Sequence, residues 1–98
     1  MLDEIKKIQG INHTDFDTMI TTWIDSAKLD LKSVGIVDTK VNIPDSLVQS
    51  AIITYVLSFL DVVNAELYAN SYTLQKDTLR HLTEYIDSSI VVENIEVA

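Results

Sequence analysis

The 98-residue sequence contains no cysteine, and it has only two glycines and one proline. Without cysteine, disulfides, thiolate metal sites and cysteine nucleophiles are all excluded, and a reducing compartment is a natural setting. Two glycines cannot build a dinucleotide-binding or phosphate-binding glycine loop. So little glycine and proline, with 47% hydrophobic residues, is not the composition of a linker or a disordered chain. At this length we expect one domain.

Long uninterrupted apolar runs are also missing. The most apolar stretch, residues 47–63, is too short to span a bilayer and is broken by polar residues such as Gln49 and Asp61. The N-terminus has acids before its lysines and no apolar core after them, unlike a signal peptide. We therefore expect a soluble, intracellular protein with no membrane partner. The glycosylation-like triplet at Asn12 is then better interpreted as a helix cap.

Positive charge is scarce. The sequence contains seven lysines and arginines and fifteen aspartates and glutamates, which gives a net charge of −8. Neither lysine nor arginine occurs after Arg80. Binding to the phosphate backbone of a nucleic acid requires clustered lysine and arginine, so we expect no sequence-specific binding of nucleic acid. An acidic surface that keeps the protein soluble, or that repels DNA, agrees with this balance.

Apolar spacing predicts two helices in the first third of the chain. Leu2 to Gln9 has apolar residues on one side, and Gly10 suits its end. Asp15 to Val34 has an apolar stripe at helical spacing, followed by Gly35. Residues 36–43 are predicted to be a connector.

The third predicted helix starts at Pro44 and runs to about Val63, with a pattern that allows continuation to Tyr68. Apolar residues cover most of its circumference. Its broad face, expected to be core, consists of Leu47, Val48, Ala51, Ile52, Tyr55, Val56, Phe59, Val62 and Val63. A second stripe, Ile53, Leu57 and Leu60, flanks that face. Either the first helix or the connector covers this flank, or a neighbouring subunit does.

Residues 70–73, Asn-Ser-Tyr-Thr, are predicted to break the helical pattern before a fourth helix from Leu74 to about Ser88. The overall prediction is an all-α fold, a small bundle of three main helices plus a short N-terminal helix, occupying residues 1–88. Residues 89–98 form an extended or disordered tail, because β-branched residues favour extended backbone. Its candidate partner-binding residues, suited to pairing with another molecule's strand, are Val91, Val92, Ile95 and Val97.

No constellation for catalysis or metal binding stands out. His13 with Asp15 and Asp17 resembles a metal cluster, but acids and a small polar cap are expected at a helix start. Asp77 and His81, one turn apart, are most simply part of a solvated charged face. The aromatic residues Phe16, Trp23, Tyr55, Phe59 and Tyr85 are expected in the core, and some of them at a subunit boundary. We therefore expect no enzyme activity and no cofactor.

Two segments carry a resemblance to a known family. The opening Asp15-Phe16-Asp17 with the stripe through Trp23, Ile24 and Ala27, and the Pro44-started apolar helix through Val56, resemble the head–tail connector proteins of tailed phages. The resemblance covers roughly residues 2–60 and is weaker over residues 74–88. The match is one of helix order and polarity rather than of catalytic signatures.

This resemblance implies an all-helical head-completion adaptor in the virion neck, assembled in the host cytoplasm. Such an adaptor forms a ring on the portal protein, extends the DNA channel and presents a surface to a stopper or tail-completion protein. The rival interpretation is a small acidic regulator that mimics DNA and occupies a basic partner. Its carboxylates would need phosphate-like spacing, whereas here they are scattered over several predicted helices.

Overall fold

A computed structural model describes residues 1–86 as an all-helical fold. Three long helices, α2 (Asp17–Ser33), α4 (Ser46–Leu60) and α5 (Ala65–Arg80), make up most of it. Two short helices, α1 (Leu2–Gln9) and α3 (Asp38–Asn42), accompany them, and a single 3₁₀ turn, η1 (Thr83–Tyr85), follows α5. The predicted fold class is confirmed.

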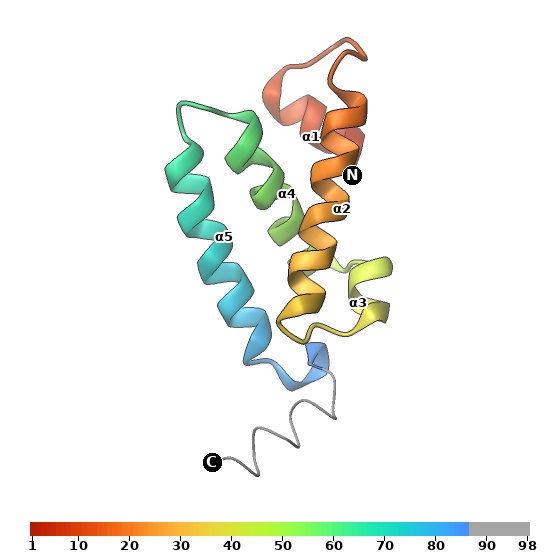
Figure 1. Ribbon diagram of the computed structural model, residues 1–98, viewed down its shortest axis with the longest axis vertical. Helices are drawn as coiled ribbons and strands as arrows, with labels where there is room; N and C mark the ends of the chain where they lie inside the picture. Colours follow the sequence, from red (N-terminus) through yellow and green to blue (C-terminus); the bar gives the residue numbers. More distant parts are fainter. Residues whose placement is uncertain (87–98) are drawn as a thin grey trace.

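Helix α4 is the central helix of the bundle. Figure 1 shows it between α2 and α5, with α1 beside the start of α2 and α3 at the opposite end. Helix α4 contacts both long neighbours, and α1 packs on α2 and α4. None of the helices in residues 1–86 has the length and apolarity needed to cross a bilayer.

The core is one cluster of side chains from every helix and from the turn after α5. Its buried members are Ile5, Ile20, Ile24, Ala27, Leu31, Ile36, Val41, Val48, Ala51, Ile52, Val56, Leu57, Tyr72, Leu79 and Tyr85. Five of them belong to α4, which explains why that helix is apolar around so much of its circumference.

Glycines end the first two helices as the sequence predicts. Gly10 has φ +68° and Gly35 has φ +97°, the left-handed backbone that glycine adopts without steric cost. The N–H of Ile11 donates to the carbonyl of Lys6, and the N–H of Ile36 donates to the carbonyl of Leu31, so each of these helix ends has a carbonyl satisfied by the residue after the glycine.

The predicted break at residues 70–73 is wrong. These residues lie inside α5, and Tyr72 is buried in the core. The real break falls between α4 and α5, where the Asp61 carboxylate accepts the backbone N–H of Asn64 and turns the chain. Residues 36–43 are also more ordered than predicted, because they contain α3.

Because α4 ends at Leu60, part of its predicted core face is at the surface. Val62 and Val63 lie in the turn and are exposed, as are Phe59 near the helix end and Leu47 near its start. Phe59 still stacks on Trp23 of α2, with ring centroids 5.6 Å apart. Of the predicted core aromatics, Tyr85 is buried, whereas Phe16 and Phe59 are exposed.

Candidate interaction surfaces

The predicted interface flank on α4 lies largely inside the chain. Leu57 is only 4% exposed and belongs to the core cluster, together with the fully buried Ile5 of α1. Ile53 and Leu60 are partly buried and pack against the same cluster. Leu57 therefore has almost no surface left for a neighbouring subunit in this conformation. Helix α1 contacts α4 and contributes Ile5 to the same cluster. The predicted tail residues, Val91, Val92, Ile95 and Val97, lie outside the described residues.

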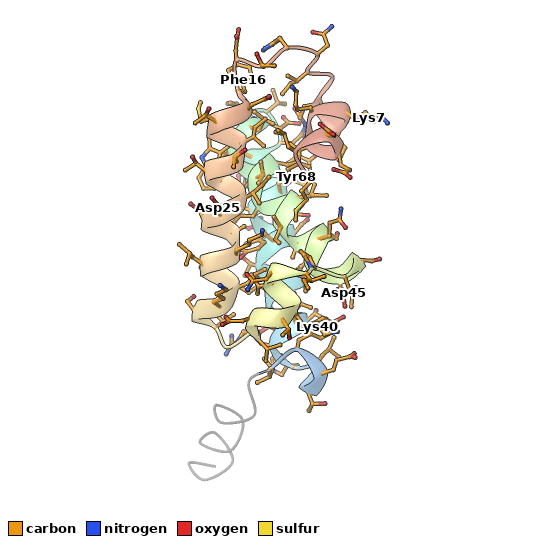
Figure 2. All side chains as sticks on the ribbon, turned by 90° about the vertical axis from the view of Figure 1, so that its right-hand side faces the viewer. Lys7, Phe16, Asp25, Lys40, Asp45 and Tyr68 are labelled. Carbon is orange, nitrogen blue, oxygen red and sulfur yellow. The ribbon has the colours of Figure 1, made fainter. Side chains whose placement is uncertain are left out.

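Exposed apolar side chains occur at other places. One group surrounds the turn between α4 and α5 and consists of Phe59, Val62, Val63 and Leu67. Val63 is 92% exposed, which leaves almost all of its apolar area in water. Phe16 and Met19, at the start of α2, are exposed at the same end of the bundle, where Figure 2 labels Phe16.

A second apolar surface lies between the outer sides of α4 and α5. A groove of about 120 Å³ is lined by Leu47 and Ser50 from α4 and by Gln75, Thr78 and Leu79 from α5. Leu47 is 52% exposed, and Leu79 is buried. The side-chain amide of Gln75 donates to the hydroxyl of Ser50 over 3.1 Å, which ties the two helices together beside the groove.

Hydrogen bonds and ion pairs of charged side chains connect the helices. The carboxylate of Asp30 on α2 accepts the Tyr72 hydroxyl at 2.6 Å and the Lys76 ammonium at 3.1 Å, both from α5. Lys6 pairs with Asp17 at 2.8 Å between α1 and α2. Burial raises the pKa of Tyr72 above its ordinary value, and the bond to Asp30 raises it further, so this hydroxyl remains a donor.

Asp45 joins three elements. Its carboxylate accepts the N–H groups of Leu47 and Val48 as the N-cap of α4, and it also accepts the Tyr85 hydroxyl. Lys40 lies 3.8 Å from the same carboxylate and 5.0 Å from the centre of the Tyr85 ring. The Tyr85 hydrogen bond, with the backbone N–H of Val48, holds the pKa of Asp45 below its usual range. The same contact raises the pKa of Tyr85 to about 12.

Acid is therefore expected to loosen α4 through Asp45. A lowered folded pKa means that the unfolded state binds more protons, so stability is present above the ordinary pKa, about 3.8, and is lost as the pH falls below it. In Asp45→Asn the amide still caps the helix, and the thermal midpoint should fall less steeply below pH 4. Thermal melts from pH 6 to pH 2.5 measure this, with Asp25→Asn on the exposed outer side of α2 as control. An unchanged acid slope in Asp45→Asn would contradict this role.

None of the residues considered for metal binding or catalysis lines the groove between α4 and α5. His13 and Asp15 contact each other at an exposed position, while Asp17 turns to Lys6. His81 and Arg80 both lie beside Asp77 on the exposed side of α5. Within residues 1–86 no group of three metal-ligating side chains comes together. The groove and the exposed residues at the α4–α5 turn were not found from the sequence, because neither surface exists until α4 and α5 are paired.

Comparison with known proteins identifies a family that the chain matches. The family model described as phage connector protein matches residues 1–84 of the chain. No curated protein matches, and no solved structure does. The matched range extends from the first residue of the chain into η1 and therefore includes every helix described above.

Proposed function

Because the chain belongs to the phage connector protein family, we propose that it completes the filled head by forming a ring on the portal protein. A structural connector role in a phage follows from the family itself. We further propose that the ring extends the DNA channel and receives the stopper or tail-completion protein. The virion neck is the location that the family implies.

The observation that carries the proposal is the family match across residues 1–84, and the surface of the fold supports it. Large apolar side chains are exposed at both the α4–α5 turn and the α4–α5 groove, although a single chain has already buried its core. Exposed apolar surface of this kind typically marks contacts with other proteins. An assembly protein can bury such surface against its partners, whereas in an isolated monomer the same apolar side chains stay in contact with water.

The charge distribution also suits a conduit for DNA better than a DNA mimic. Five carboxylates, those of Asp17, Asp30, Asp38, Asp45 and Asp77, lie within 4 Å of a lysine or arginine of their own chain. They are therefore partly neutralised, and they come from several different helices. The net charge of −8 would still keep passing DNA from sticking to the channel.

Co-sedimentation with purified portal rings tests the proposal. The full chain should pellet with portal and stay in the supernatant alone, with saturation at a fixed number of copies per ring. A chain that stays in the supernatant at every portal concentration would overturn the proposal. Bovine serum albumin in place of portal controls for non-specific sedimentation.

The tail gives a second expected result. Deleting residues 91–98 should leave the thermal midpoint nearly unchanged, because the described residues alone form a core cluster with side chains from every helix. The same deletion should weaken co-sedimentation with portal or with stopper, since the tail's alternating apolar residues suit pairing with another chain. Differential scanning fluorimetry and the sedimentation assay measure the two effects. Full portal and stopper binding by the shortened chain would contradict the assignment of the tail as a partner-binding segment.

A further inference from the structure

One end of the bundle carries large apolar side chains that the chain leaves exposed. Val62 and Val63 lie in the turn between α4 and α5, and Leu67 lies in the first turn of α5. Phe59 near the end of α4 and Met19 near the start of α2 are each about half exposed. Figure 1 shows the start of α2, the end of α4 and the start of α5 together at the upper end of the bundle.

Trp23 connects the α2 part of this surface to the α4 part. It lies one turn after Met19 on α2, and its ring stacks on that of Phe59 with centroids 5.6 Å apart. The Phe59 ring also packs against Tyr55, at 5.2 Å, so it is held on two sides. Aromatic residues and methionine are enriched at protein contacts, and aromatic side chains that are already packed make good anchors. We call this set the turn surface: Met19, Trp23, Phe59, Val62, Val63 and Leu67.

The turn surface has acidic neighbours. Asp61 and Glu66 immediately precede Val62 and Leu67 in the sequence, and Glu66 is exposed. Hydrogen bonds from Asn64 lower the pKa of Asp61 below its ordinary value, so this carboxylate is ionised at neutral pH. The two segments that supply the turn surface lie within residues 8–27 and 41–75, and neither range contains a lysine or an arginine.

The lysines at this end of the bundle belong to α1. Lys6 pairs with Asp17 at 2.8 Å, so its charge is already matched within the chain. Figure 2 shows Lys7 on the outer side of α1 and Phe16, one turn before Met19, on the opposite side of the same end. The turn surface therefore combines exposed apolar side chains with negative charge that no lysine beside it offsets.

This charge restricts the partners that suit the surface. DNA and anionic lipid bilayers are negatively charged, so Asp61 and Glu66 repel both of them. A second copy that presented the same surface would bring like charges together. A protein whose apolar surface is bordered by lysine or arginine fits both properties, because it covers the apolar side chains and places cations beside the carboxylates.

We propose that the turn surface binds a partner protein through an apolar surface that is bordered by lysine or arginine. The inference goes beyond the proposed function, because it names the chemistry of one contact on the single chain and requires neither a ring nor the portal.

Synthetic amphipathic helical peptides test this chemistry on the full chain. The first peptide has leucine on one face and lysine on the other; the second has glutamate in place of lysine, and the third has serine in place of leucine. Trp23 is the single tryptophan of the chain and belongs to the turn surface, so its emission reports binding there. The leucine–lysine peptide should bind in isothermal titration calorimetry and shift the Trp23 emission to shorter wavelength, and the other two should do neither.

Two leucines of α5 provide a matched pair of variants. Leu67 and Leu74 are 64% and 69% exposed, but only Leu67 belongs to the turn surface. Leu67→Ser should weaken binding of the leucine–lysine peptide about tenfold, since burying an apolar side chain contributes about 1.5–3 kcal/mol. Leu74→Ser should leave the affinity unchanged. Both variants should keep the wild-type circular dichroism spectrum, because both side chains are largely in water.

The charge has its own matched pair, Glu66→Gln and Asp25→Asn, which both change exposed acids. Glu66→Gln should weaken peptide binding at low salt but not at high salt, where screening removes the attraction. Asp25→Asn, on the outer side of α2, should have no effect.

Equal affinity of the leucine–lysine and leucine–glutamate peptides would overturn the proposal, as would equal effects of Leu67→Ser and Leu74→Ser. Binding of the chain to vesicles of phosphatidylserine, or self-association in sedimentation velocity, would also overturn it if Leu67→Ser abolished that binding. Failure of the peptides leaves the co-sedimentation with portal untouched. Failure of the wild-type chain to bind portal would contradict the proposed function instead.

Discussion

Replacing Leu57 with glutamate should unfold the chain or shift its thermal midpoint by far more than any surface substitution. Leu57 is 4% exposed and lies in the core cluster with residues from every helix. The change removes a packed apolar side chain and puts a carboxylate in its place in the core. The two penalties together come to roughly 4 kcal/mol or more, a large share of the 5–15 kcal/mol that typically separates folded from unfolded domains.

The measurement is far-ultraviolet circular dichroism with a thermal melt, and Leu29→Glu is the matched control. Leu29 is also a helical leucine but is exposed, so its glutamate variant should keep the wild-type helix content and midpoint. A folded Leu57→Glu chain with a wild-type midpoint would show that α4 presents this residue to solvent and that α1 does not cover it. Leu57 would then again be a candidate for contact with a neighbouring subunit.

The second large effect is expected at Asp30, where α2 and α5 are joined. Asp30→Ala removes the acceptor of the Tyr72 hydroxyl, and that hydroxyl is then left without a partner in a residue that is 6% exposed. An unsatisfied buried donor of this kind costs about 1–3 kcal/mol. Loss of the Lys76 contact adds little, because the ion pair is partly exposed to solvent.

A double-mutant cycle with Tyr72→Phe separates the two causes. Asp30→Ala should cost less in the Tyr72→Phe background, because no orphaned hydroxyl remains once the phenol is gone. Urea unfolding of the four proteins gives the coupling energy. Strictly additive effects would mean that the Tyr72 hydroxyl gains nothing from Asp30 in the folded chain.

The sequence predicts a helix boundary well when the residue that sets the boundary stands at that boundary in the sequence. Helix α1 has the predicted bounds, because Gly10 marks its end in the sequence. Residues 70–73 misled the prediction because their individual helix propensities are modest. In the structure, burial of Tyr72 and its bond to Asp30 outweigh that preference. The break at residues 61–64 contains neither glycine nor proline, and it depends on the Asp61 carboxylate accepting from Asn64.

The surfaces were harder to predict than the helices. A helical projection identifies Leu57 as part of a second apolar stripe, but it cannot say that Leu57 is buried in a cluster to which α1 contributes Ile5. The groove at Leu47 and Thr78 requires residues about 30 positions apart to be brought together by the pairing of α4 with α5.

The mass of the complex between purified portal and the full chain, measured by native mass spectrometry, tests the central claim most directly. The account predicts a discrete species in which many copies of the chain sit on one portal, in a fixed ratio to portal subunits. A chain that remains monomeric and leaves the portal mass unchanged at saturating concentration would contradict the account.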